Sequence, residues 1–129
     1  MKAIQYSRGA TRLAGALFMG AMALTAVAGE KDTHEVTFDA IKPFARGNLG
    51  DARNSTDALQ YIGCSISGTA ALCIAVNSAG VQHSCSTTDP DLMTAIRTIH
   101  GDSYLVFRYG IDGICTSVTV YNDSRFAPK

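Results

Sequence analysis

The chain lacks the sequence motifs of the common catalytic sites. It has no G-x-S-x-G turn, no H-E-x-x-H pair, no phosphate-binding loop and no G-x-G-x-x-G. Serine hydrolases, zinc proteases and nucleotide-binding enzymes of the usual kinds therefore find no support. His34 and Glu35 begin like the zinc-protease motif, but Phe38 stands where the second histidine is needed. We predict no catalytic, cofactor-binding or metal-ligating residue, and no cofactor.

Clustered positive charge is also missing. Three of the 11 basic residues and none of the 11 acidic residues precede Gly29, so the rest of the chain carries 8 basic against 11 acidic residues. A net charge near −3 without a basic cluster gives non-specific nucleic-acid binding no electrostatic basis. We expect no nucleic-acid partner.

The segment Met1–Ala28 has the pattern of a secretory signal peptide. Lys2, Arg8 and Arg12 form a basic start, an uncharged run extends from Leu13 to Ala28, and Ala26-Val27-Ala28 ends it. The alternative is a membrane anchor, but the uncharged run is shorter than the roughly 20 residues that span a bilayer. We expect cleavage near Ala28, no membrane span afterwards, and a periplasmic or extracellular protein.

Four cysteines, Cys64, Cys73, Cys85 and Cys115, are the other strong signal. An even number of cysteines in a short exported chain predicts two disulfides. The cysteines are widely separated along the chain, so no C-x-x-C pair exists to form a zinc knuckle.

The part from residue 29 to residue 59 is the least regular. Its only strand candidate is Glu35–Phe38, and Pro43, Gly47, Gly50 and the polar run Asp51–Asp57 are typical of loops. Residues 60 to 129 form the predicted disulfide-stapled α+β domain.

A hairpin begins this domain. Tyr61–Ser67 and Ala70–Val76 are separated by Gly68-Thr69, which suits a type II′ turn with glycine first. In this register Cys64 faces Cys73 as a non-hydrogen-bonded pair about 4.5 Å apart. Cys85 is then left for Cys115. The pairings 64–85 with 73–115, and 64–115 with 73–85, stay open.

A strand over Val81–Cys85 precedes a helix over Pro90–His100, which Asp89 caps. The last hairpin joins Tyr104–Tyr109 to Ile114–Tyr121. The predicted fold is one antiparallel sheet of about five strands in the order β-β-β-α-β-β, with a single helix packed on one face. That core face carries Leu105, Phe107, Tyr109, Ile114, Thr116, Val118 and Val120, whereas Arg108, Cys115, Ser117 and Thr119 point away from it.

These observations favour a small exported, non-enzymatic protein that binds a protein or an envelope component, and a protease inhibitor would be one form of it. The candidate contact surfaces are the polar sheet face with Arg108, Ser117, Thr119 and Tyr121, or the segment Asp51–Asp57. The alternative is a small periplasmic hydrolase or metal-dependent enzyme that uses His83, His100 and nearby aspartates. Close approach of histidines to each other or to Asp89, Asp91 or Asp102 would support that alternative.

Overall fold

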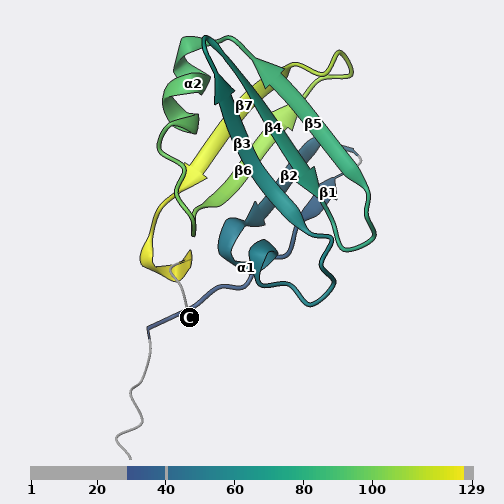
Figure 1. The fold of residues 1–129 in the computed structure, drawn as a ribbon, viewed down its shortest axis with the longest axis vertical. Helices are drawn as coiled ribbons and strands as arrows, with labels where there is room; N and C mark the ends of the chain where they lie inside the picture. The colour runs from purple at the N-terminus through teal and green to yellow at the C-terminus, as the bar shows by residue number, and fades with distance from the viewer. Residues whose placement is uncertain (1–28, 40, 127–129) are drawn as a thin grey trace, which may run out of the picture.

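The protein consists of two antiparallel sheets that face each other (Figure 1). A computed structural model describes residues 29–39 and 41–126, and residues 1–28, with the expected signal peptide, lie outside them. The elements are, in order, β1 (Thr37–Asp39), β2 (Phe44–Asn48), α1 (Leu49–Arg53), β3 (Tyr61–Ser67), β4 (Ala70–Val76), β5 (Gln82–Thr87), α2 (Pro90–Ile96), β6 (Tyr104–Tyr109), β7 (Cys115–Tyr121) and the 3-10 helix η1 (Ser124–Phe126).

The α+β class is confirmed, but the single five-stranded sheet is wrong. The strands form a four-stranded sheet in the order β1-β2-β6-β7 and a three-stranded sheet in the order β3-β4-β5. The last hairpin joins its sheet through β6, which pairs with β2. Within the described residues, it pairs with the other sheet through an isolated parallel bridge between Ser86 and Ile114.

The hydrophobic core lies between the two sheets. Ala45, Leu105 and Phe107 of one sheet are fully buried, as are Cys73 and Ala75 of the other. The face that we expected the helix to cover is therefore covered by the second sheet. In Figure 1, α2 lies at one end of the sheets and α1 lies toward the other.

Helix α2 contributes Met93 and Ile96 to the core and contacts β7 and β4. Its start is as predicted, because the Asp89 carboxylate accepts from the N–H groups of Asp91 and Leu92 and Pro90 is the first residue. It ends at Ile96, earlier than the expected His100. Among the described residues no helix is long and apolar enough to cross a membrane.

The first hairpin of the domain forms in the predicted register. Ser67 pairs with Ala70 and Cys64 pairs with Cys73. Gly68 has a φ of 60°, the left-handed conformation that the first position of this turn requires, and Thr69 is not among the residues with positive φ. The two-residue turn and the alternation of side chains along the two strands were sufficient to predict every cross-strand residue pair of this hairpin.

Both disulfides join the expected partners. Cys64 is bonded to Cys73 with a Cα–Cα distance of 4.0 Å, and Cys85 is bonded to Cys115 with a Cα–Cα distance of 4.9 Å. The alternative disulfide pairings, 64–85 with 73–115 and 64–115 with 73–85, do not occur in the structure. The first bond joins neighbouring strands of one sheet, whereas the second joins β5 to β7 and so links the two sheets.

The orientation expected for Cys115 is wrong, and an irregularity in β7 explains why. Arg108 pairs with Ser117, but its neighbour Tyr109 pairs with Cys115, so one extra residue is accommodated in β7. A bulge of this kind reverses the alternation of side chains beyond it. Cys115 therefore turns into the core, where it is 4% exposed, and reaches Cys85.

The loop expected from Pro43 to Asp57 is instead largely β2 and α1. Strand β2 is central in its sheet. Gly47 lies within it, and because glycine is typical of loops, the segment was not predicted to be a strand. An ideal Cβ at Gly47 would lie 3.1 Å from both Cα and Cγ2 of Val36. Glycine is therefore needed there for close approach of the segment before β1, which overlaps the expected strand Glu35–Phe38.

Gly47→Ala is expected to lower the free energy of unfolding by about 1–3 kcal/mol, because the added methyl group overpacks against Val36. The matched control is Gly63→Ala in β3, where an ideal Cβ meets only the Tyr61 ring, with Oη at 3.6 Å. The control should be neutral or slightly stabilising. Urea denaturation of both variants checks this, and equal losses of stability would contradict the packing argument.

Candidate functional site

The outer face of the four-stranded sheet is an exposed surface with two arginines. Cross-strand partners share a face, so the ladder places Arg46 beside Val106 and Thr119, and Arg108 beside Phe44 and Ser117. We call this surface the arginine face, and define it by Phe44, Arg46, Tyr104, Val106, Arg108, Ser117, Thr119 and Tyr121. The predicted common face of Arg108, Ser117 and Thr119 is thus present, and its use as a contact surface stays a prediction.

Phe44 organises the positive charge of this face. The guanidinium carbons of Arg46 and Arg108 lie 5.5 and 5.4 Å from the centre of the Phe44 ring, within cation–π range. Arg46 also donates from Nε to Oγ1 of Thr37 at 3.1 Å. Neither arginine forms a salt bridge with a carboxylate in residues 29–39 or 41–126. Both arginines are exposed, with the Phe44 ring between them.

Asp39, the cross-strand partner of Phe44, lies at the β1 edge of the same face. Hydrogen bonds from the N–H groups of Lys42 and Ile41, with smaller contributions from the charges of Lys42 and Arg46, lower the pKa of Asp39.

An aromatic cluster borders the arginine face at one end. The Tyr104 ring stacks on Phe126 at 5.0 Å between centroids, and it also contacts His34 and Tyr121 at 4.7 and 5.6 Å. Burial raises the pKa of Tyr104, and the nearby Arg46 guanidinium acts in the opposite direction. Tyr121 remains 43% exposed, so the cluster presents one accessible phenol beside the arginines.

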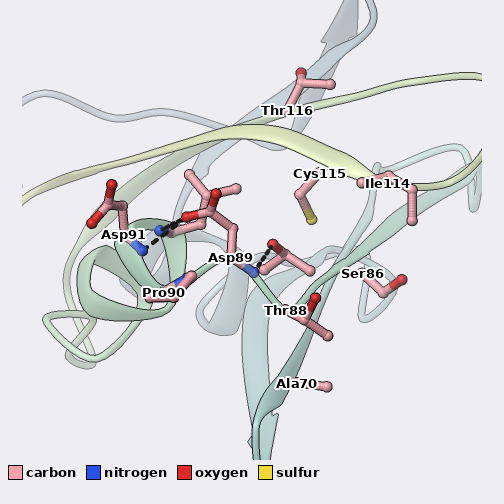
Figure 2. Close-up of a pocket in the computed structure, with 11 residues that line it drawn as sticks. Ala70, Ser86, Thr88, Asp89, Pro90, Asp91, Ile114, Cys115 and Thr116 are labelled. Atoms are coloured by element: carbon pink, nitrogen blue, oxygen red, sulfur yellow. Dashed lines mark hydrogen bonds between the residues drawn. The ribbon is translucent and has the colours of Figure 1, made fainter.

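A cleft of about 760 Å³ with a mixed polar and apolar lining lies elsewhere, at the junction of the two sheets (Figure 2). Its hydroxyl groups come from Ser86, Thr87, Thr88 and Thr116, and Asp89 and Asp91 stand at the start of α2. The Asp89 carboxylate caps the helix, while its N–H donates to Thr87 Oγ1 at 3.0 Å. The residues that line the cleft include no histidine, lysine, arginine or tyrosine. Asp89, Pro90 and Asp91 form the start of α2. Together with the other residues of the cleft they form no recognisable catalytic arrangement.

The three histidines lie in three different surroundings. His83 lies between Phe38 and Tyr109, with ring centroids at 4.6 and 5.1 Å. His34 lies beside Tyr104, with Asp32 at 3.8 Å from its Nε2. His100 follows α2 and accepts at Nδ1 from the N–H of Asp102. The contacts of the described residues thus give no support to a joint site of His83 and His100.

The polar residues that follow α2 hold the chain in place. The Asp102 carboxylate pairs with Arg53 at 3.2 Å. The fully buried Ser103 accepts from the N–H of His100 and donates to Asn122. Within the described part of the chain no group of three or more His, Cys, Asp or Glu residues is placed to hold a metal ion.

A scan against protein-family models, a search of curated proteins and a search of solved structures each found no match.

The segment Asp51–Asp57, the second predicted contact surface, uses its carboxylates to order the backbone. Asp51 accepts from the N–H of His34 at 2.9 Å. Asp57 accepts from the N–H groups of Leu59 and Gln60 and, at 2.6 Å, from Nε2 of Gln60. Gln60 in turn accepts from the N–H of Val36 through Oε1. These bonds connect the segment to the strand region before β1.

The hydrogen bond from the Gln60 side chain, with those from the N–H groups of Leu59 and Gln60, lowers the pKa of Asp57 from 3.8 to about 2. A lowered pKa means that the ionised carboxylate stabilises the fold above its unfolded pKa. This contribution is lost as the pH falls toward 2. Asp57→Asn should therefore be less stable than the wild type at pH 6, and should lose less stability between pH 5 and pH 2. Urea denaturation across this range checks it, and parallel pH profiles would contradict it.

Proposed function

We propose that this protein is an exported, non-enzymatic binding protein whose arginine face binds an acidic segment of a protein partner. The observation that carries the proposal is the pair of guanidinium groups on Phe44, neither of which forms a salt bridge within the described chain. Arginine is the cation best suited to such contacts, because its planar guanidinium can bind a carboxylate through two parallel hydrogen bonds.

The residue types on this face favour a protein partner. Arginine, tyrosine and phenylalanine are enriched at protein interfaces, and arginine and tyrosine are frequent among residues that dominate the binding energy. Arg46, Arg108 and Tyr121 are exposed, whereas Phe44 and Val106 are half-buried between them. An aromatic and aliphatic centre with cations at its edge can exclude water from charge-assisted hydrogen bonds, which strengthens them.

Local charge gives the interaction an orientation. The chain beyond Ala28 is mildly acidic, whereas the arginine face carries two arginines and, at its β1 edge, one carboxylate, that of Asp39. An acidic partner is then attracted to this face and repelled by other parts of the surface, which favours encounter in one orientation.

Export is supported by the leader pattern of the sequence and by the two disulfides. Disulfides form and persist in oxidising compartments such as the periplasm and the extracellular medium. A binding protein in such a compartment benefits from a rigid frame, because a preformed face loses less conformational entropy when it binds.

The partner can be captured by placing a photo-cross-linking amino acid at Thr119, an exposed position next to Val106 on the arginine face. We expect one discrete adduct in the native compartment, with the cross-link in a segment rich in aspartate or glutamate. An adduct to a polysaccharide or lipid, or no adduct, would overturn the acidic-protein assignment.

Arg46→Gln and Arg108→Gln should each weaken binding of the captured acidic segment about tenfold or more, because each removes a charge-assisted contact of about 1.5–3 kcal/mol. The matched control is Arg97→Gln, which removes an exposed arginine at the end of α2, away from this face. Titration of the three variants by calorimetry checks this. Equal affinities for all three variants would exclude the arginine face as the site.

A further inference from the structure

Three of the four cysteines lie in one row across the three-stranded sheet. On β4, Cys73 is paired in register with Cys64 on one side and with Cys85 on the other. The bonds are Cys64–Cys73 and Cys85–Cys115. Cys73 therefore has two neighbours to which it could be bonded, and it is bonded to one of them.

The geometry of the row allows the second partner to be reached. Cys64 and Cys73 have Cα atoms 4.0 Å apart, which identifies the closer, non-hydrogen-bonded type of pair (about 4.5 Å) and not the hydrogen-bonded type (about 5.5 Å). Cys73 then directs its backbone groups toward β5, so Cys73 and Cys85 form the hydrogen-bonded type of pair, with Cα atoms about 5.5 Å apart. That separation lies in the range over which disulfides form.

The four cysteines differ in solvent exposure, and this difference determines which one an external thiol can reach first. Cys64 is partly exposed, whereas Cys73, Cys85 and Cys115 are 0%, 2% and 4% exposed. An external thiolate therefore reaches the sulfur of Cys64 first. Attack there forms a mixed disulfide on Cys64 and expels Cys73 as a thiolate, directly opposite Cys85.

We propose that the cysteine row is a disulfide-exchange switch operated by a dithiol reductant. One thiolate of the dithiol bonds to Cys64 Sγ, the Cys64–Cys73 bond breaks, and Cys73 carries the electron pair as a thiolate. This thiolate bonds to Cys85 Sγ, the Cys85–Cys115 bond breaks, and Cys115 leaves as a thiolate that takes up a proton. The second thiol of the reductant then resolves the mixed disulfide, so that Cys64 becomes a thiol and the reductant becomes a cyclic disulfide.

The net two-electron reduction leaves one disulfide where there were two: Cys64–Cys73 and Cys85–Cys115 are both lost, and Cys73–Cys85 is formed. Before exchange, Cys85–Cys115 links β5 to β7 and hence the two sheets. After exchange, Cys73–Cys85 lies within the three-stranded sheet. The start of β7 is released, and with it one wall of the cleft that contains Ile114, Cys115 and Thr116. The switch thus converts a link between sheets into a link within one sheet.

A time course on the purified protein with both disulfides tests this. One equivalent of dithiothreitol is added, thiols are trapped at intervals with N-ethylmaleimide, and peptides are mapped by mass without reduction. We expect the Cys85–Cys115 peptide to be lost while a Cys73–Cys85 peptide appears, with label on Cys64 and Cys115. Label confined to Cys64 and Cys73, with Cys85–Cys115 intact, would overturn the proposal, as would label on all four cysteines without a Cys73–Cys85 peptide.

A matched pair of variants isolates the exchange step. Cys64→Ser leaves Cys73 as a thiol opposite Cys85, so the Cys73–Cys85 peptide and labelled Cys115 should appear without any reductant. Cys73→Ser leaves Cys64 as the thiol, which is not opposite Cys85, so Cys85–Cys115 should persist and only Cys64 should be labelled. Identical maps in which both variants keep Cys85–Cys115 would contradict the proposal. If the Cys64→Ser variant fails to fold, the wild-type time course decides alone.

Discussion

The structure depends on the junction at which the two sheets are joined. Apart from core packing, the sheets meet there through the Cys85–Cys115 disulfide, the Ser86–Ile114 bridge and a hydrogen bond from the N–H of Ser86 to the carbonyl of Gly113 at 2.9 Å. Neither sheet could bury its inner face alone, because a sheet of three or four short strands needs a second layer for stability. The junction holds the two layers in the register that closes the core.

Local rules were sufficient for two features whose contacts are short in sequence. The alternation of side chains across Gly68-Thr69 placed Cys64 opposite Cys73, and the Asp89-Pro90 pair marked the start of α2. Both depend on residues that are close together along the chain, where turn and cap chemistry determine the geometry. The Cys85–Cys115 bond followed by elimination, and so it was predicted correctly although the expected orientation of Cys115 was wrong.

The division of the strands into two sheets could not be predicted from such local signals. Which strand β6 joins is decided by side-chain packing between segments that lie far apart along the chain, and parity within each hairpin is the same for one sheet or two. The sequence does not predict the bulge in β7 either. Thr116 is the extra residue, and no glycine or proline adjoins it to mark the bulge.

Only the part of the arginine face that belongs to the last hairpin could be predicted from the sequence. Arg108, Ser117 and Thr119 belong to the last hairpin, whose alternation was clear. Phe44 and Arg46 were missed because Pro43 and Gly47 made their segment resemble a loop. The alternation of Phe44, Ala45 and Arg46 was the available signal, with Ala45 buried and its neighbours facing outward.

Hydrogen bonds hold the two ends of the described chain together. The N–H of Asp32 donates to the carbonyl of Arg125, and the amide of the buried Asn48 donates to the carbonyls of Asp102 and Phe126. The first residues of the fold thus pack against the last. A ribosome delivers residue 32 long before residue 125, so the bond between them can form only after all of the described strands have been synthesised. Until then the segment around Asp32 lacks its hydrogen-bond partner in η1.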